Sequence, residues 1–225
     1  MLNRRWLLSA LARLVMGWGV CTAAAVAFGP AVVMAFRDPV DSVLETLMPD
    51  FIASLSAPTV HPGNGDLLMT VHAYHSVPIA GDYSIAPWVP METSIDAGHD
   101  LVPVALLLGV LLAWPHRRGR DALAALLLGV AACALMLVVT VALHFAGLYQ
   151  INIQRAAAAL HQTRTAPIYL PLFLFMESGG GWLLALLVAV AIGVLAGSRT
   201  SPRRAERGAV AWGISAPAAN LPQKG

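Results

Sequence analysis

Hydrophobic residues are bunched along this chain rather than spaced at one regular period. Two apolar runs, 101–114 and 122–148, flank the short basic turn PHRRGRD, and further apolar runs lie near the N-terminus and after a glycine triplet. A helix needs about 20 apolar residues to cross the hydrocarbon core of a bilayer. The pattern therefore predicts an all-α membrane protein with about four transmembrane helices, of which two form a hairpin over residues 101–149.

The remaining segments are placed relative to this hairpin. The apolar stretch of 14–36 is longer than the core of a cleavable signal peptide, which favours an uncleaved anchor. The predicted order is a signal-anchor helix (1–37), an acidic extracytoplasmic lobe (38–100), the hairpin (101–149), an outer loop (150–180), a fourth transmembrane helix (181–197) and a basic disordered cytoplasmic tail (198–225).

The lobe carries most of the carboxylates and has a mixed α/β pattern. Apolar positions in 38–55 follow helical spacing, which predicts a short amphipathic helix along the membrane surface. The segment DLLMTVHAYHSVPI predicts a strand, with Leu67, Met69, Val71 and Ala73 on one face and Leu68, Thr70, His72 and Tyr74 on the other. After the turn at Gly81-Asp82, YSIAPWVPMETSI returns as a second, proline-interrupted strand.

The outer loop leaves two alternatives open. One is a long kinked helix over 167–196, and the other is an interfacial or re-entrant segment that ends near Glu177 and is followed by a minimal span. A straight helix of 30 residues would reach about 45 Å, which exceeds the hydrocarbon core of about 30 Å. A break at the glycine triplet, or a strong tilt, is therefore expected.

Composition and charge agree with a bilayer environment. Hydrophobic residues make up 58% of the 225 and charged residues only 12%, about half of what a soluble domain carries. The net charge of +2 is too small to indicate a nucleic-acid partner. Arginines gather at the N-terminus, in the hairpin turn and in the tail, so the positive-inside rule predicts that both termini lie in the cytoplasm.

The histidines and cysteines form no recognisable metal or nucleophile motif. His61, His72, His75 and His99 lie in the lobe beside carboxylates, but HxH, HExxH and paired Cys/His sets are absent. Cys133 and His144 are eleven residues apart, about 16 Å along a helix, which excludes a dyad within that helix. From the sequence we assign no catalytic residue, no metal site and no cofactor.

Glu177, before Ser178 and the glycine triplet, is the most suggestive residue near the membrane. An ionisable group at membrane depth is a functional candidate by default. We define a candidate polar outer-face cluster from residues that the topology brings to one side, namely Glu177, Arg155, Arg164, His144 and His99. The alternative is that Glu177 only marks a wet loop before the last span.

The order of segments is a signal anchor, a small outer lobe with a strand, the entry HDLVPVALLLGVLLAWPHRRGR into a helical hairpin, and a final span. This layout resembles that of the small exosortase-associated inner-membrane proteins of bacteria, of the exosortase H-linked type. Exosortases are transpeptidase-like processors of proteins that carry a sorting signal. The resemblance implies an accessory or assembly role in envelope protein sorting, with another membrane protein such as an exosortase as partner. It supplies no site residues.

Two functions follow from the sequence as expectations. The first is the non-enzymatic accessory role, exerted through helix packing in the lipid bilayer and through the acidic lobe. The second is a membrane enzyme or transporter component with a polar site on the outer face around Glu177. A meeting of Glu177 with Arg155 or a histidine would favour the second.

Overall fold

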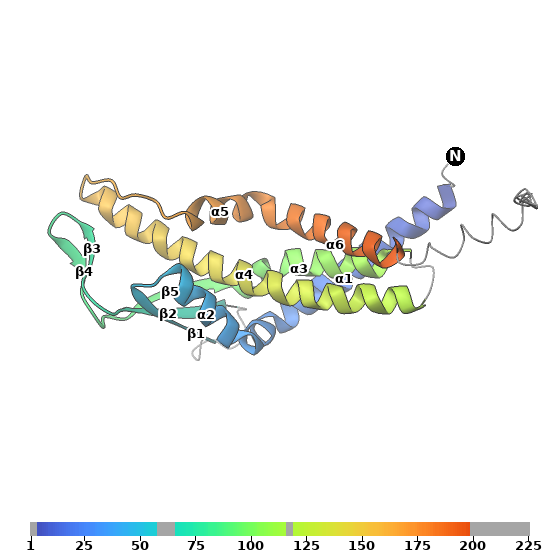
Figure 1. Ribbon diagram of the computed structural model, residues 1–225, viewed down its shortest axis with the longest axis horizontal. Helices are drawn as coiled ribbons and strands as arrows, with labels where there is room; N and C mark the ends of the chain where they lie inside the picture. The colour runs from blue at the N-terminus through green and yellow to red at the C-terminus, as the bar shows by residue number, and fades with distance from the viewer. Residues whose placement is uncertain (1–3, 58–65, 116–118, 199–225) are drawn as a thin grey trace, which may run out of the picture.

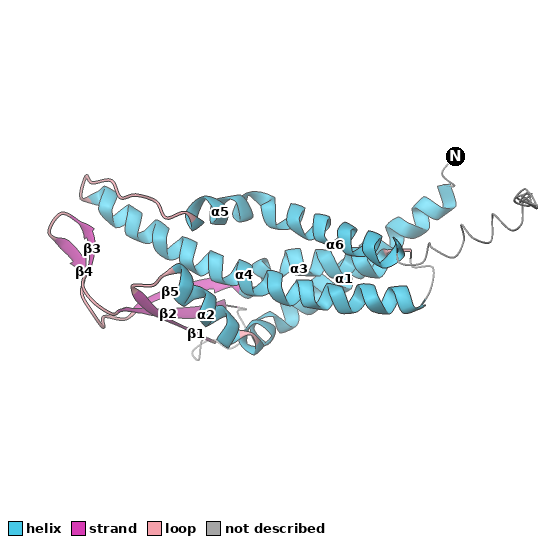
Figure 2. Ribbon diagram, in the orientation of Figure 1, coloured by secondary structure: helices cyan, strands magenta, loops and turns pink. Residues whose placement is uncertain are grey.

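The computed structural model describes residues 4–57, 66–115 and 119–198. Most of this part of the chain is helical, and a small sheet region lies at one end of an elongated molecule (Figure 2). The helices are α1 (Arg4–Ala35), α2 (Arg37–Leu47), α3 (Ala97–Ala113), α4 (Gly119–Ala159), α5 (Tyr169–Phe175), the π-helical turn η1 (Met176–Gly180) and α6 (Gly181–Ser198). The strands are β1 (Phe51–Ser56), β2 (Asp66–Ala73), β3 (Val77–Ala80), β4 (Tyr83–Ile85) and β5 (Met91–Asp96).

Three helical segments are long and apolar enough to cross a membrane. They are Leu8–Ala35, Gly119–Ala159 and Tyr169–Ala196, and α3 is a shorter apolar helix. Large apolar side chains on them face outward, for example Val20 (67% exposed), Leu127 (64%) and Leu187 (59%). Such surfaces are stable against lipid tails and not against water. The chain is therefore a multi-pass membrane protein whose helices contact lipid.

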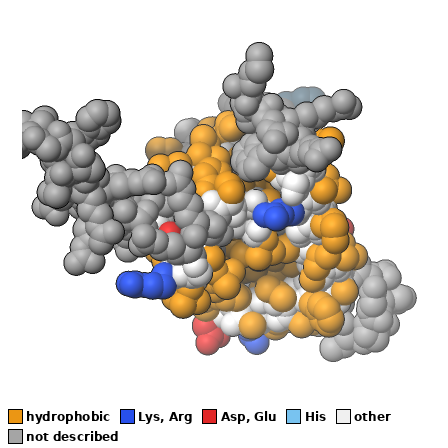
Figure 3. Space-filling model, turned by 90° about the vertical axis from the view of Figure 1, so that its right-hand side faces the viewer, with side chains coloured by type: hydrophobic (Ala, Val, Ile, Leu, Met, Phe, Trp, Pro, Cys, Tyr) orange, Lys and Arg blue, Asp and Glu red, His pale blue; other side chains and the backbone are white. Residues whose placement is uncertain are grey.

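The axes of the long helices are roughly aligned, and successive helices run in opposite directions. Figure 1 shows the start of α1, the end of α3, the start of α4 and the end of α6 at one end of the molecule, while the strands gather toward the other end. Seen from the first end, hydrophobic side chains cover most of the described surface, with a few basic side chains among them (Figure 3).

The helix bundle is held by close backbone approach. α1 lies against α3, and α3 also contacts α4 and α6. At the α1–α3 crossing, a Cβ placed on Gly17 would lie 3.3 Å from the carbonyl oxygen of Gly109. A Cβ on Gly109 would lie 2.9 Å from the backbone of Trp18. Small residues allow this contact, as in other membrane helix pairs.

The lobe is built on a small sheet whose buried side chains are continuous with the core of the helix bundle. β1, β2 and β5 form an antiparallel sheet in the order β1-β2-β5, and β3 and β4 form a separate hairpin. Leu67, Met69, Val71 and Ala73 of β2 are all completely buried, which confirms the alternation that the sequence predicts. Burial of one large aliphatic side chain is worth about 1.5–3 kcal/mol. The sheet therefore orders itself around the inward-facing side of its central strand.

The amphipathic helix is shorter than its sequence pattern. α2 covers Arg37–Leu47 and buries Val40 and Leu44, whereas Phe51–Ser56 is the strand β1. The apolar residues of 38–55 follow a helical repeat as far as α2 extends and then the two-residue repeat of the strand β1. Without a clear boundary between them, the two repeats look like one helix in the sequence. Asp41 connects the two elements, since its Oδ1 accepts a hydrogen bond from the backbone N–H of Leu55 at 3.2 Å.

The lobe is packed on the second half of α4. The hydroxyl of Tyr149 donates a hydrogen bond to the sulfur of Met91 at 3.2 Å. The ring of Phe51 meets Tyr149 edge to face, with centroids 5.0 Å apart. α2 also contacts α4. The 41 residues of α4 span about 60 Å, about twice the hydrocarbon core, so roughly half of the helix supports the lobe rather than crossing lipid.

Two segments differ from the boundaries that the sequence predicts. α4 continues past residue 149 to Ala159, because the alanine-rich stretch after Tyr149 favours helix and contains no breaker. After a loop, α5, η1 and α6 follow one another as a kinked helix, which is the first of the two alternatives for this region. The kink is at Gly179, whose φ of 103° lies outside the helical range. The predicted break at the glycine triplet is confirmed.

Candidate functional site

The first turn of α3 brings two titratable side chains to the lobe end of the bundle. α3 begins after Asp96, whose Oδ1 accepts a hydrogen bond from the backbone N–H of Gly98 at 2.8 Å and so caps the helix. His99 and Asp100 follow in this turn. Asp100 is only 3% exposed, whereas the His99 side chain is 59% exposed. The strand-to-helix junction of the lobe thus places a carboxyl group inside the bundle.

Asp100 is paired with His144 of α4. Asp100 Oδ1 and His144 Nδ1 lie 2.6 Å apart, although the two residues are 44 positions apart in the chain. When the Asp100 carboxyl is ionised it can only accept, and the Nδ1–H of His144 is then the donor. Only 2% of the Asp100 side chain and 12% of the His144 side chain are exposed. A charge-assisted bond in such a place is among the stronger hydrogen bonds in proteins.

Glu177 joins the pair from the π-helical turn η1. Its Oε1 lies 3.8 Å from His144 Nδ1, and its Oε2 lies 3.9 Å from His99 Nε2. The Ser178 hydroxyl donates a hydrogen bond to the Phe175 carbonyl oxygen at 2.9 Å within the same turn. The backbone of this segment leaves helical geometry at Gly179, so η1 is the kink between α5 and α6. Here the turn is where a carboxylate faces two histidines.

Rings surround the cluster on its buried side. The His144 and His99 rings meet edge to face with centroids 6.2 Å apart, and the Phe173 ring of α5 lies 5.7 Å from His144.

The second carboxylate oxygen of Asp100, Oδ2, is buried and has no hydrogen-bond partner in the described part of the chain. An unsatisfied buried oxygen costs about 1–3 kcal/mol, more if charged, so it needs a reason.

We call Asp100, His144, Glu177 and His99 the acid–histidine cluster. It unites three of the five residues that the sequence placed in the candidate polar cluster, namely Glu177, His144 and His99. Arg164 instead donates a hydrogen bond to the Pro78 carbonyl oxygen at 2.6 Å, and Arg155 is exposed on the last turns of α4.

Asp100 is the member that sequence reasoning missed. We grouped it with the acidic residues of the lobe, because it directly precedes the apolar run that marks the hairpin. The available signal was a carboxylate in the first turn of an apolar helix, which is costly unless it is paired or functional. The pairing with His144 depends on how α3 and α4 pack, which the sequence does not show.

The other sequence candidates lie elsewhere. His72 Nδ1 is 3.4 Å from the Trp88 carbonyl oxygen, and His75 Nε2 is 3.6 Å from Asp50 Oδ1. His61 lies outside the described residues. Cys133 is buried in the middle of α4, where its thiol contacts the Val104 carbonyl oxygen at 3.9 Å. In the described part of the chain, these residues form no cluster with the composition of a metal site.

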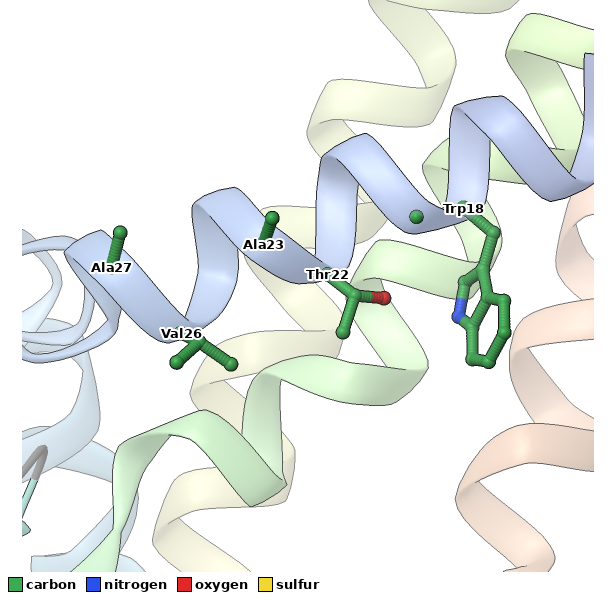
Figure 4. A pocket seen from close by; sticks show the side chains of 6 residues that line it. Trp18, Thr22, Ala23, Val26 and Ala27 are labelled. Carbon is green, nitrogen blue, oxygen red and sulfur yellow. The ribbon is translucent and has the colours of Figure 1, made fainter.

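The cluster has the composition of a cation site. Asp100, His144 and Glu177 each offer one ligand atom, and these atoms lie within 4.8 Å of one another. They come from three different helical segments, α3, α4 and η1. A hollow on α1 differs clearly, because it is lined by small and apolar side chains with Trp18 and Thr22 (Figure 4). The ionisable chemistry of the described bundle is therefore concentrated where the spans meet the lobe.

Comparisons with known proteins add no assignment. No protein-family model matches the chain, and neither a curated protein nor a solved structure matches it.

Proposed function

We propose that this chain is a cation-binding component of a membrane transporter or membrane enzyme, and that the acid–histidine cluster is its working site. The observation that carries the proposal is Asp100, a carboxylate buried within an apolar helix and facing His144 and Glu177. Ionisable groups within membrane helices are expensive and mark ion, proton or substrate sites. A purely structural role would be served better by an apolar side chain of similar size.

Electrostatics favours a positive occupant. Asp100 and Glu177 bring two carboxylates close together, and in the described part of the chain their ion pairs are with histidines. Even with one imidazole protonated, two ionised carboxylates leave negative charge in the cluster, and a low dielectric raises the cost of an unpaired charge. A bound proton or metal cation would supply the missing positive charge.

The proposed topology has four spans, with α3 as the short second span. Arginines at the N-terminus, in the hairpin turn and in the tail favour cytoplasmic N- and C-termini in the bacterial inner membrane. The joint position of these helix ends at one end of the molecule supports this arrangement (Figure 1). In this topology the lobe and the acid–histidine cluster are extracytoplasmic.

The test is the thermal unfolding of the purified chain in mild detergent with a panel of cations, from Na⁺, Mg²⁺ and Ca²⁺ to Mn²⁺, Co²⁺ and Zn²⁺. A ligand that binds only the folded state raises the midpoint, by an amount equivalent to about 2.7 kcal/mol at 100 times its Kd. We expect at least one cation to raise the midpoint of the wild type and to leave that of Glu177→Gln unchanged. Glu92→Gln, an exposed carboxylate of β5, is the matched control and retains the response.

Two results would contradict the proposal. One is a wild-type midpoint that no cation in the panel changes. The other is a cation response of equal size in the wild type and in Glu177→Gln, since the cation would then bind elsewhere.

A second candidate is the accessory role in envelope protein sorting that the resemblance implies. It is supported by the seating of the lobe on α4 through Phe51, Met91 and Tyr149, which gives a partner a fixed surface. Affinity purification from mild detergent, followed by identification of what co-purifies, tests it. Recovery of a membrane-bound sorting enzyme is the expected result. Recovery of the chain alone as a monomer would contradict the accessory role.

A further inference from the structure

We propose that Asp100, His144, Glu177 and His99 bind one divalent transition-metal ion of the Zn²⁺ type. This inference rests on the proposed cation-binding function and specifies the ion class and the full ligand set. Three of the ligands have donor atoms within 4.8 Å of one another, and the fourth, His99, has its Nε2 3.9 Å from Glu177 Oε2.

The donor types select the class of metal. Two imidazole nitrogens and two carboxylate oxygens suit Zn²⁺ and Co²⁺, which accept nitrogen and oxygen together. Mg²⁺ and Ca²⁺ prefer sites built from oxygen alone, and Cu⁺ prefers thiolate or thioether sulfur. Cys133 does not contribute, because its thiol contacts the Val104 carbonyl oxygen instead of the cluster.

The spacing is close to that of an occupied site. Zinc bonds to nitrogen and oxygen are about 2.0–2.2 Å long, so ligand atoms of a tetrahedral site lie about 3.3–3.6 Å apart. His144 Nδ1 is 2.6 Å from Asp100 Oδ1 and 3.8 Å from Glu177 Oε1. The ion would take the place of the proton between Asp100 and His144. Occupation would require the Asp100 and His144 ligand atoms to separate by about 0.7 Å, and Glu177, whose side chain is 37% exposed, to approach by a few tenths of an ångström.

The orphaned oxygen of Asp100 points to a ligand independently of the spacing. Asp100 Oδ2 is buried without a hydrogen-bond partner, although the residue is 3% exposed and Oδ1 is already bonded to His144. Buried polar atoms in native proteins are nearly always satisfied. A metal ion bound by Asp100 through one or both oxygens would offset the negative charge of the buried carboxylate, including its share on Oδ2. It also joins α3, α4 and η1 at one point.

The experiment uses the full-length chain in mild detergent, purified with a tag that contains no histidine and stripped with a chelator. Co²⁺ is titrated as a spectroscopic substitute for Zn²⁺, and Zn²⁺ is then added in competition. We expect the intense visible bands of tetrahedral Co²⁺, saturation at one ion per chain, and loss of the bands when Zn²⁺ is added. Glu177→Gln and His144→Gln should abolish the bands. His99→Gln should weaken binding by at least about 10–100-fold, the range for groups that only support a ligand, and should alter the spectrum because it removes one of the four ligands.

His75→Gln is the matched control, because His75 also faces a carboxylate, Asp50, but lies in the lobe away from the cluster. It should bind Co²⁺ as the wild type does. Size-exclusion profiles distinguish loss of a ligand from loss of folding, and the partly exposed Glu177 and His99 are the positions where substitution is best tolerated.

Each contrary outcome has one meaning. A response to Mg²⁺, Ca²⁺ or Na⁺ that depends on Glu177, without Co²⁺ or Zn²⁺ binding, overturns the transition-metal inference and leaves the cation site standing. Binding of Co²⁺ with unchanged affinity and spectrum in His99→Gln overturns the four-ligand set. If no cation in the panel binds, both the inference and the proposed function fall.

Discussion

Asp100 and His144 are separated by 44 positions in the sequence and by 2.6 Å between Oδ1 and Nδ1 in the fold. The bond joins the first turn of a short apolar helix to the middle of the longest helix in the described chain. It is almost completely shielded from solvent, and Glu177 lies within 4 Å of the same imidazole nitrogen. This relationship ties the packing of the spans to the one polar centre that we propose to be functional.

The Asp100–His144 bond should contribute measurably to stability. Asp100→Ala leaves the buried Nδ1–H of His144 without its acceptor, so we expect the free energy of unfolding to fall by about 1–3 kcal/mol. Denaturant unfolding in micelles, with chelator present, measures it. Glu92→Ala, an exposed carboxylate, should change it by less than about 0.5 kcal/mol. Equal effects of the two substitutions would show that the bond contributes nothing.

The positive φ of Gly179 should be needed to hold Glu177 in place. At φ 103° an alanine is strained, so Gly179→Ala should cost about 1–2 kcal/mol and reduce the cation-dependent shift in thermal midpoint. Gly19→Ala is the matched control, because a Cβ on Gly19 of α1 meets nothing within 4 Å. It should leave cation binding unchanged. A full cation response in Gly179→Ala would mean that the kink does not position the carboxylate.

Much of the scaffold can be predicted from the sequence because it depends on local patterns. Long apolar runs identify the spans, alternation identifies β2, and the glycine triplet identifies the break before α6. Each of these patterns lies in the same short stretch of sequence as the element that it predicts. The end of α4 was less predictable, since its alanine-rich extension resembles both a surface helix and an outer loop.

The acid–histidine cluster depends on long-range packing, which explains why only part of it could be predicted. Glu177, His144 and His99 were candidates because the topology brings them to one side of the membrane. Arg155 and Arg164 were grouped with them on the same ground, yet Arg164 bonds to the Pro78 carbonyl oxygen. Asp100 was passed over, since its place at the start of an apolar helix is a local signal, whereas its pairing with His144 depends on how α3 and α4 pack.

The proposed topology predicts opposite locations for the two ends of the bundle. A reporter that is active only outside the cytoplasm, fused after Asp82 in the β3–β4 turn, should be active. The same reporter fused after Arg120, at the start of α4, should be silent, while a fluorescent protein at that position should fold and fluoresce. The reverse pattern would overturn the assignment of the lobe and of the cluster to the outer face.

Asp41 should make the lobe sensitive to pH. Partial burial raises the pKa of this carboxyl, although the Leu55 N–H bond and Arg37 oppose the shift. The folded state then holds the proton more tightly than the unfolded state, so the stabilisation is fully present below the unfolded pKa, about 3.9, and is lost as the pH rises through the folded value.

Asp41→Asn removes this titration and keeps an oxygen for the Leu55 N–H. Relative to this variant, the wild type should therefore lose stability as the pH rises from about 4 to about 7. Hydrogen exchange at the Leu55 amide, together with unfolding at the two pH values, measures the difference. A pH dependence identical in the wild type and in Asp41→Asn would rule out Asp41 as its source.

The most direct test of the cation site is the metal content of the chain as it comes from the cell. The protein is purified from native membranes with a tag that contains no histidine and without added metal, and its metals are quantified by mass spectrometry beside Glu177→Gln and Glu92→Gln. The account predicts about one zinc-like transition-metal ion per chain in the wild type and in Glu92→Gln, and strong depletion in Glu177→Gln. Equal metal content in all three proteins, or none in any, would contradict it.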